Sequence, residues 1–201
     1  MRLFVAIDIE TEIRQRVSNF LDGVRGFATD ARWVFPESLH ITLKFVGEKS
    51  EQETEPVKRA LGTIRPHTFD LKVRGYGFFP TARAPKVFWI GIEAGPELGS
   101  LAAAVDEALA TIGIPKEEHA YNAHLTLARA GNDRRVRKHK GVNRPASFRL
   151  LQEKLAALPS PEFGTMTARE FFLYQSRLSP GGSKYTKLAR FVLQERIETT
   201  A

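Results

Sequence analysis

His40-Ile41-Thr42-Leu43 and His124-Leu125-Thr126-Leu127 are two copies of one tetrapeptide pattern, and each stands in a segment typical of a β-strand. Alternate side chains of a strand share a face, so His and Thr of each copy point one way and the apolar residues point the other. One His-x-Thr would be an ordinary structural feature, because Thr is a good strand former and a lone His is more often structural than catalytic. Two matched copies predict a site in which two histidines face one substrate.

Strand-like and helix-like segments alternate along the chain. Apolar residues recur at helical spacing in four segments, and we expect helices over residues 13–24, 57–64, 98–112 and 148–158. Apolar, β-branched and aromatic runs predict strands over residues 2–8, 33–35, 39–46, 69–74, 87–92, 123–128, 171–174 and 187–193. Short connections such as the loop 78–83 and the turn 179–183 favour antiparallel pairing and therefore an α+β fold.

The two tetrapeptides also divide the chain. Each lies in an expected strand that follows an expected helix, which suggests an ancient duplication giving two facing lobes. No change of composition marks a flexible linker between them. We therefore expect residues 1–201 to form a single domain of two interleaved lobes, each contributing one tetrapeptide.

Composition narrows the class of protein. The chain has 201 residues, 42% hydrophobic and 26% charged, and no cysteine, which excludes disulfides, zinc–thiolate sites and thiol nucleophiles. No stretch approaches the roughly 20 apolar residues of a membrane span, and the opening apolar run is too short for a signal peptide, so we expect a soluble cytoplasmic protein. The net charge of +7 favours an anionic partner, whether RNA, DNA, a nucleotide or an acidic protein surface.

Two histidines are the simplest means of general acid–base catalysis near neutral pH, because an imidazole with a pKa of about 6.5 can donate or accept a proton there. Phosphodiester cleavage needs a base for the attacking oxygen and an acid for the leaving oxygen. Thr42 and Thr126 would donate hydrogen bonds to the non-bridging oxygens. Arg129, two residues beyond Leu127, would by strand alternation lie on a side where it adds a positive charge. By this reasoning alone the two histidines are nearly equivalent.

Competing chemistries have weaker support in the sequence. A metal site would need clustered His and carboxylates, yet neither tetrapeptide contains an acidic residue. No Gly-x-Ser-x-Gly nucleophile motif and no Walker-type phosphate loop is present. His67, His119 and His139 lack a repeated context, and we expect them at the surface or in packing roles. We therefore expect no metal and no cofactor.

Three further groups are candidates for RNA contact, each with a structural alternative. Phe45, Phe78 and Phe79 would stack on a base or pack in the core, with Phe78 placed in a loop. The basic run 134–140 would contact the RNA backbone or form a solvated loop. The segment 179–187 would bring backbone amides and a cation to a phosphate or form an ordinary hairpin.

The paired tetrapeptides resemble those of the 2H phosphoesterase superfamily, and within it the chain is similar to the bacterial and archaeal RNA 2′,3′-cyclic phosphodiesterases, historically called 2′-5′ RNA ligases. The resemblance runs nearly from end to end. Its landmarks, in chain order, are Arg2-Leu3-Phe4-Val5-Ala6-Ile7, Trp33-Val34, Leu39 to Gly47, Phe79-Pro80, Arg83, Pro85, Val87, Trp89, His124 to Arg129, Ser179-Pro180-Gly181-Gly182 and Tyr185-Thr186.

The resemblance implies a two-lobed α+β fold, with antiparallel sheets related by a pseudo-two-fold and flanking helices, and with the active-site cleft between the lobes. It implies metal-independent opening of a 2′,3′-cyclic phosphate at an RNA end, single-stranded or tRNA-derived, to a 2′-phosphomonoester. His40 would be the proton donor and His124 the proton acceptor. Thr42, Thr126 and Arg129 would bind the phosphate. We expect a monomer, and candidate RNA contacts are Phe45, Phe78, Arg83, Lys184 and Tyr185.

Two alternatives stay open at this point. The protein would be an RNA-end binding module without turnover, although intact His and Thr in both copies argue against that. It would otherwise be a 2H enzyme for another small cyclic phosphate, such as ADP-ribose cyclic phosphate, or for 2′-5′ linked oligonucleotides. Running in reverse, the same reaction would join a 5′-hydroxyl in a 2′-5′ linkage.

Chelation tests the metal-independent scheme. Because no ligand cluster accompanies the histidines, we predict full hydrolytic activity in EDTA, measured by end-group analysis of an oligonucleotide that carries a 2′,3′-cyclic phosphate. Loss of activity in EDTA, with recovery on adding a divalent ion, would contradict the acid–base scheme.

Overall fold

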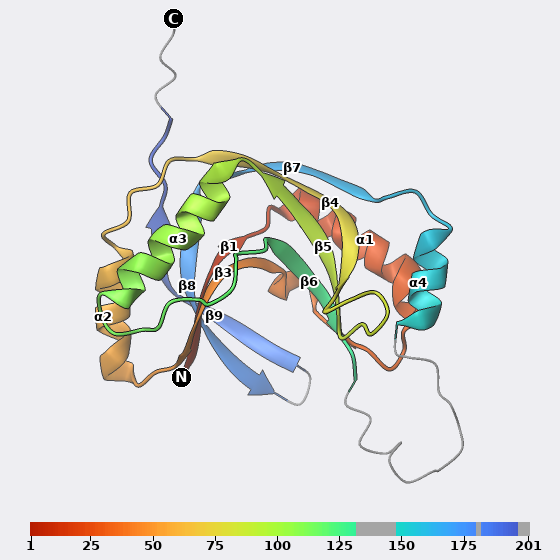
Figure 1. Cartoon of the computed structure of the whole chain (residues 1–201), viewed down its shortest axis with the longest axis horizontal. Coiled ribbons are helices and arrows are strands. Elements are labelled where there is room, and N and C mark those ends of the chain that lie inside the picture. Colours follow the sequence, from red (N-terminus) through yellow and green to blue (C-terminus); the bar gives the residue numbers. More distant parts are fainter. Residues whose placement is uncertain (132–147, 180–181, 197–201) are drawn as a thin grey trace, which may run out of the picture.

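One antiparallel sheet runs through the whole molecule. The computed structural model describes residues 1–131, 148–179 and 182–196, and in these residues four α-helices pack on a nine-stranded sheet (Figure 1). The expected α+β class is confirmed. Among these residues no helix combines the length and the apolar composition needed to cross a membrane.

The elements follow one another in a mixed order. The strands are β1 (Arg2–Asp8), β2 (Arg32–Trp33), β3 (His40–Glu48), β4 (Phe69–Phe79), β5 (Val87–Ala94), β6 (His124–Arg129), β7 (Glu162–Ala168), β8 (Glu170–Ser179) and β9 (Gly182–Val192). The α-helices are α1 (Thr11–Val24), α2 (Glu51–Leu61), α3 (Pro96–Ala110) and α4 (Arg149–Ala156), and two short 3₁₀ turns are η1 (Arg25–Phe27) and η2 (Pro36–Ser38).

The order of the strands is symmetric about the centre of the sheet. It reads β7-β4-β5-β6-β3-β1-β8-β9, with β2 beside β6. The two tetrapeptide strands, β6 and β3, are therefore the central neighbours. The two halves also have the same order of elements. In each, a strand and a helix precede the tetrapeptide strand, as β1, α1 and β3 in one half and as β5, α3 and β6 in the other. The resemblance implied antiparallel sheets in two lobes related by a pseudo-two-fold; in the structure the strands of the two halves join through β3 and β6 in one sheet.

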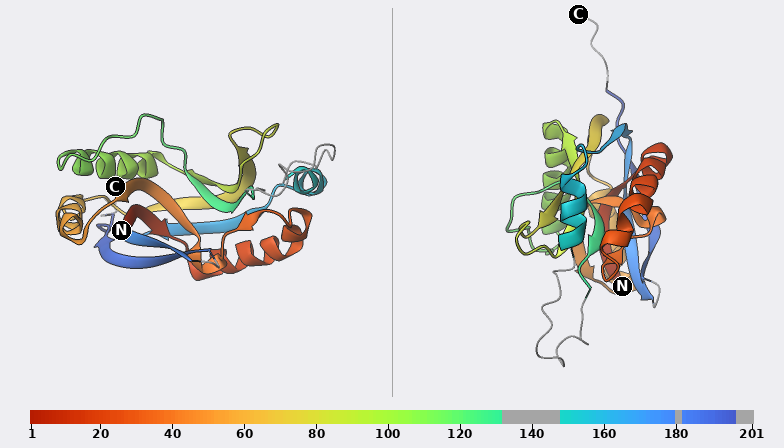
Figure 2. Two further views of the ribbon diagram at one scale, coloured as in Figure 1. Left: turned by 90° about the horizontal axis from the view of Figure 1, so that it is seen from below. Right: turned by 90° about the vertical axis from the view of Figure 1, so that its right-hand side faces the viewer.

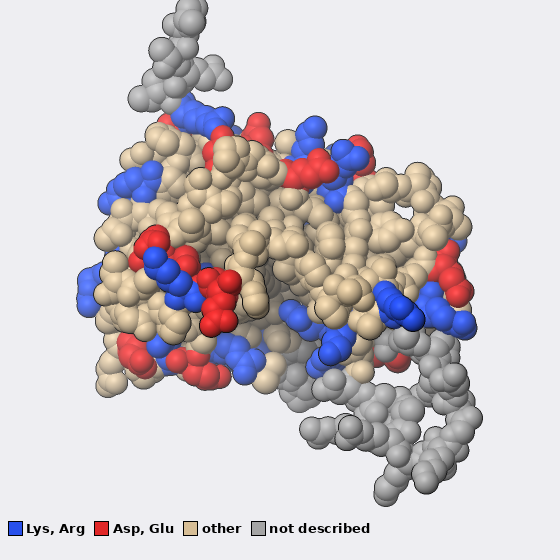
Figure 3. Space-filling view, viewed as in Figure 1, with Lys and Arg blue, Asp and Glu red and all other residues tan. Residues whose placement is uncertain are grey.

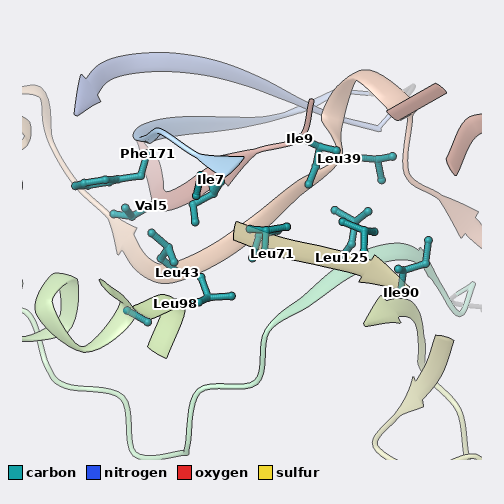
Figure 4. Packing of buried hydrophobic residues seen from close by; sticks show 14 of the residues in the cluster. Val5, Ile7, Ile9, Leu39, Leu43, Leu71, Ile90, Leu98, Leu125 and Phe171 are labelled. Atoms are coloured by element: carbon teal, nitrogen blue, oxygen red, sulfur yellow. The ribbon is translucent and has the colours of Figure 1, made fainter. Parts of the chain in front are cut away.

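The helices lie in two pairs at opposite ends of the sheet (Figures 1 and 2). Helices α2 and α3 contact each other and α3 contacts β3, while α1 contacts β7 and α4 contacts η1. Their buried faces join those of the strands in one hydrophobic cluster. Figure 4 shows part of it, where Val5, Leu43 and Leu98 from β1, β3 and α3 approach one another. Both halves of the sheet thus share a single core.

Helix α2 begins at Glu51, six residues before the start expected from apolar spacing. The cause is a capping box. The Ser50 hydroxyl accepts from the Glu53 backbone N–H at 3.2 Å, and the Glu53 carboxylate accepts from the Ser50 N–H at 2.7 Å. This pairing satisfies two backbone donors that would otherwise have no partner at the helix end.

Two strands differ from the prediction. β4 extends to Phe79, so that Phe78 and Phe79, expected in a loop, are strand residues that pair with β5. β7 was not expected at all. Its alternation is broken by a bulge, because Val73 of β4 faces Gly164 while Arg74 faces Glu162, and Gly164 has a φ of +122°.

A buried lysine ties β3 to the segment that leads into β6. Lys44 is only 3% exposed, and its ammonium pairs with the Asp106 carboxylate on α3. It also donates to the Pro115 carbonyl at 2.9 Å and lies 3.7 Å from the Glu117 carboxylate. Because a buried charge needs partners on every side, these contacts fix the position of the 115–117 segment over the sheet.

Replacing this lysine should destabilise the fold. Lys44→Met leaves the Asp106 carboxylate and the Pro115 carbonyl without their donor, and we expect the free energy of unfolding to fall by about 1–3 kcal/mol. Urea denaturation measures the change. The control is Lys58→Met on α2, whose pair with Glu55 is exposed and should change stability by less than about 1 kcal/mol. Equal effects of the two variants would contradict the anchoring role of Lys44.

Candidate active site

The two tetrapeptides lie side by side in the sheet. Ile41 of β3 is the antiparallel partner of Leu125 of β6, and both are fully buried. Continued by one residue each way, this register sets His40 opposite Thr126 and Thr42 opposite His124. Directly opposite side chains of a sheet are about 4.5–5.5 Å apart at Cβ, so the four polar groups form one small array on a single face.

A β-bulge follows the threonine in each tetrapeptide strand. In β6, Trp89 faces Thr126 but Phe88 faces Ala128, and Leu127 is the extra residue. The bulge interrupts the alternation: Leu127 and Ala128 are both buried and Arg129 is exposed. Strict alternation would have put Arg129 on the face of Leu127. The bulge instead turns it to the face of the histidines, which corrects the sequence argument for its position.

The same bulge occurs in β3, where Ala6 faces Thr42 and Val5 faces Lys44. Phe45 therefore occupies in β3 the place that Arg129 occupies in β6. Its ring is 62% exposed and lies 6.4 Å from that of Phe4, centroid to centroid, on the histidine face. Phe45 is thus available for stacking and does not belong to the core.

Each imidazole is oriented by a backbone carbonyl two residues earlier. His40 Nδ1 lies 2.7 Å from the Ser38 oxygen, and His124 Nδ1 lies 2.8 Å from the Asn122 oxygen. A carbonyl can only accept, so Nδ1 carries the hydrogen in both rings. Nε2 of each neutral imidazole is therefore the atom with a free lone pair.

Aromatic rings enclose both histidines. The His40 ring lies 4.7 Å from that of Phe4 and edge-on, at 5.1 Å, to that of Tyr185, and Phe4 stacks on Tyr174 at 5.1 Å. These contacts bury the His40 ring and limit its rotation, which favours a fixed direction for Nε2.

On the other half of the sheet, the His124 ring lies edge-on to Phe79 at 5.1 Å, and Phe79 stacks on Trp89 at 5.0 Å. Phe79 is thus beside the site. Phe78, which we expected to contact RNA, instead packs on Phe88 at 5.1 Å and Phe148 at 5.7 Å against the core. Successive strand residues point to opposite faces, so only one of these two phenylalanines can reach the site.

Burial lowers the pKa of both catalytic candidates below the ordinary 6.5. For His40 the effect of burial is opposed by the hydrogen bond to Ser38 and by the charge of Asp8, while His124 and Arg129 lower the pKa further. For His124 burial is opposed by the hydrogen bond to Asn122, and Arg129 again lowers the pKa. Arg129 is therefore near enough to both imidazoles for its charge to lower their pKa values.

A carboxylate distinguishes the two histidines. Asp8 at the end of β1 is the cross-strand partner of His40, whereas the corresponding partner of His124 on β5 is Gly91. Arg14 and Lys187 each donate to the Asp8 carboxylate at 2.6 Å. Burial of Asp8 opposes its ionisation, but these two cations hold the pKa of Asp8 below its ordinary value. Asp8 is therefore an anion beside His40.

A cavity of about 650 Å³ opens beside His40. Its wall combines the aromatic rings of Phe35, Tyr174 and Tyr185 with the ammonium groups of Lys184 and Lys187. Lys184 and Tyr185, both expected to contact RNA, therefore border the same space as His40. Volumes of about 300–1,000 Å³ are usual for small-molecule sites.

Other expected residues lie elsewhere or are not described. Arg83 is exposed in the loop between β4 and β5, and His67 and His119 are exposed as expected. The basic run 134–140, with His139, and the Pro180-Gly181 turn lie outside the described residues. Within the described part of the chain, no three His, Asp or Glu side chains gather closely enough to hold a metal ion.

Two residues near the array were missed by sequence reasoning. Asp8 looks like an ordinary strand end, and only the pairing of β1 with β3 brings it to His40. Tyr121 donates its hydroxyl to the Thr42 carbonyl at 3.1 Å, from the segment just before β6. Its position three residues before His124 is the one local signal that could have indicated it.

A family model, described as LigT like Phosphoesterase, matches the chain twice, over residues 7–89 and again over residues 90–185. Each match contains one tetrapeptide. The chain belongs to the LigT-like phosphoesterase family.

Relatives in this family cover nearly the whole chain. An RNA 2′,3′-cyclic phosphodiesterase of Archaeoglobus fulgidus is 35% identical over 191 residues, which are 95% of this chain and 99% of the relative. The enzyme of that name from Escherichia coli is 28% identical, covering 96% and 97%. The structure of E. coli LigT complexed with 3′-AMP superposes with a TM-score of 0.74 at 27% identity, over 96% of this chain and 97% of that chain.

The titration of the two histidines can be measured in the ligand-free protein. We expect NMR to show pKa values below 6.5 for both rings and Nδ1–H tautomers in their neutral forms. In Asp8→Asn the pKa of His40 should fall further, because the imidazolium loses a neighbouring anion, while that of His124 should change less.

The control is Asp22→Asn, which removes an exposed carboxylate on α1 that pairs with Arg25. It should leave the pKa of both histidines unchanged. An unchanged pKa of His40 in Asp8→Asn would show that Asp8 has no electrostatic effect on it.

Proposed function

We propose that this protein hydrolyses the 2′,3′-cyclic phosphodiester at the end of an RNA to a 2′-phosphomonoester, by general acid–base catalysis with His40 and His124. The observation that carries the proposal is the array of two imidazoles, each with Nε2 free, and two threonines on one face of the sheet. The names of the relatives support the substrate, because those from A. fulgidus and E. coli are both called RNA 2′,3′-cyclic phosphodiesterase.

The reaction divides between the two halves of the sheet. His124 Nε2 takes a proton from water as its oxygen attacks phosphorus, and the bond from phosphorus to the 3′ oxygen breaks on the opposite side. His40, protonated at Nε2, gives its proton to that oxygen. The Thr42 and Thr126 hydroxyls and the Arg129 guanidinium stabilise the charge that grows on the non-bridging oxygens. The product is a 2′-phosphate and a 3′-hydroxyl, and the two imidazoles have exchanged protonation states.

Asp8 supports this direction of proton transfer. A general acid must carry its proton before the reaction, and an anion opposite His40 stabilises that imidazolium. Gly91 gives His124 no such partner on β5. Around His40 the other charged groups are Arg14 on α1, Arg129 on β6, Glu37 on η2, and Lys184 and Lys187 on β9. The directly paired Asp8 is an anion that favours the protonated form of His40.

The cavity beside His40 supports the placement of the terminal nucleoside. In an in-line displacement the attacking water and the leaving oxygen are on opposite sides of phosphorus. The ribose holds the leaving 3′ oxygen and therefore lies on the side of His40, where the cavity wall offers Tyr185 and Phe35 to a base and Lys184 to a negative charge.

The same geometry allows ligation. A 5′-hydroxyl that attacks the cyclic phosphate in place of water would give its proton to His124, the bond from phosphorus to the 3′ oxygen would break, and His40 would protonate that oxygen. The product would be a 2′-5′ linkage beside a 3′-hydroxyl. End-group analysis distinguishes hydrolysis from ligation. It also tests the alternatives of a 2H enzyme for another small cyclic phosphate and of a binding module, because neither produces an RNA 2′-phosphate.

Single substitutions test the catalytic roles. We predict that His40→Ala and His124→Ala each lower the hydrolysis rate by about 10²–10⁴-fold with little loss of RNA affinity. Thr42→Val and Thr126→Val keep the shape of the side chain and should lower the hydrolysis rate less than the histidine variants do, because Arg129 and the remaining threonine still donate to the phosphate. His67→Ala, an exposed histidine outside the array, is the control.

The pH dependence of kcat/KM should be bell-shaped, with its maximum below pH 6.5, since one imidazole must be protonated and one neutral and both have lowered pKa values. Loss of the basic limb in His40→Ala and of the acidic limb in His124→Ala would support the assigned roles. Wild-type rates in both variants would leave only a binding function.

A further inference from the structure

We infer that Arg32 binds a second phosphate of the RNA, the one on the 5′ side of the terminal nucleotide, and so makes the enzyme prefer cyclic phosphates on polynucleotides to those on single nucleotides. The inference rests on the proposed function and adds the class of substrate. A single cyclic nucleotide carries only the reacting phosphate, whereas the end of an RNA chain carries another on its 5′ oxygen.

Two arginines stand directly opposite each other at the edge of the array. Arg32 of β2 is the cross-strand partner of Arg129 of β6, and both are exposed. Side chains of directly opposite residues share a face, so Arg32 also points to the histidine face. Like charges in this arrangement destabilise a sheet, and an anion bound between them or beside them removes that cost.

The position of Arg32 is enforced by its neighbour. Trp33 pairs with Ala128, its indole N–H donates to the Ala28 carbonyl at 3.0 Å, and its ring lies edge-on to the buried Phe88 at 6.0 Å. Since successive strand residues point to opposite faces, a Trp33 side chain fixed on the core side directs Arg32 outward. β2 is only two residues long, and this anchoring holds its single arginine over the end of β6.

Arg32 lies beside Arg129, next to the place proposed for the reacting phosphate. Arg129 lies close enough to both imidazoles to lower their pKa, and Arg32 is its neighbour one strand away, a spacing of about 4.8 Å in a sheet. The segment after β2 stays against β6 through the bond from the Val34 N–H to the Leu127 carbonyl at 2.8 Å. It then reaches Phe35, which lines the cavity beside His40.

An RNA whose terminal nucleoside occupies that cavity therefore has Arg32 along the same edge. Arg14 fixes this edge by donating to the Pro36 carbonyl at 2.5 Å. The space-filling view shows several Lys and Arg side chains near the lower end of β5 and β6 (Figure 3). A cationic border of this kind suits a polyanion that continues beyond the site.

The test compares three substrates: a nucleoside 2′,3′-cyclic phosphate, a dinucleotide with the same cyclic end, and that dinucleotide with an uncharged methylphosphonate linkage. For Arg32→Gln we expect kcat/KM to fall about tenfold on the charged dinucleotide and by less than about twofold on the other two substrates. On the charged dinucleotide, the slope of log kcat/KM against log salt concentration should become shallower by about 0.7. This is the change expected when one phosphate contact to a single strand is lost.

Arg59→Gln is the matched control, because it removes the same charge from the exposed surface of α2. Arg59→Gln should change kcat/KM by the same factor on all three substrates. Arg32→Lys, which keeps the charge, should retain most of the preference for the charged dinucleotide.

The outcomes separate the two proposals. Equal losses on the mononucleotide and the dinucleotide in Arg32→Gln, or no loss on either, would overturn the role of Arg32 while hydrolysis by the parent protein upholds the proposed function. Failure of the parent protein to open any of the three cyclic phosphates would overturn the proposed function itself. Thermal unfolding of the ligand-free Arg32→Gln should occur no earlier than in the parent, since the variant relieves a like-charge pair; earlier unfolding would assign Arg32 a structural role and overturn the inference.

Discussion

The pairing of Ile41 with Leu125 is the contact on which the rest of the site depends. It joins the two halves of the sheet at their central strands, and its register decides which polar groups become neighbours. A shift by one residue would turn the histidines and threonines of one strand into the core and its leucines out to solvent. Burial of both apolar partners therefore protects the arrangement of His40, His124 and their threonines.

The two halves of the sheet share one framework and differ in a few residues that matter for the chemistry. Both strands carry the bulge after threonine, and both histidines donate Nδ1–H to the carbonyl two residues earlier. The equivalent positions beyond the bulge hold Phe45 on one side and Arg129 on the other. The residues opposite the histidines are Asp8 and Gly91. Two like frameworks thus present different neighbours to the two imidazoles, which is what acid and base roles require.

The sequence predicted the tetrapeptide strands, the long helices and the α+β class, because these depend on local periodicity. It predicted less well where the chain departs from periodicity. The bulge at Gly164 concealed β7. The continuation of β4 to Phe79 turned Phe78, a candidate for RNA contact, toward the core. The start of α2 was readable in the Ser50–Glu53 capping box. The position of Asp8 beside His40 could not be predicted in this way. It arises from the pairing of β1 with β3, and the two residues are 32 positions apart in the chain.

The electrostatics of the site couple protonation to substrate binding. In the ligand-free protein burial and Arg129 keep the pKa of His40 below its ordinary value, although a general acid must hold a proton. An anionic phosphate placed beside Nε2 adds a second negative charge to that of Asp8 and favours the imidazolium. By linkage, a substrate that favours protonation of His40 is itself bound more tightly by the protonated form. In the proposed mechanism a bound phosphate therefore favours the protonated form of His40 that the reaction needs, and it opposes the effect of Arg129 on the pKa of that ring.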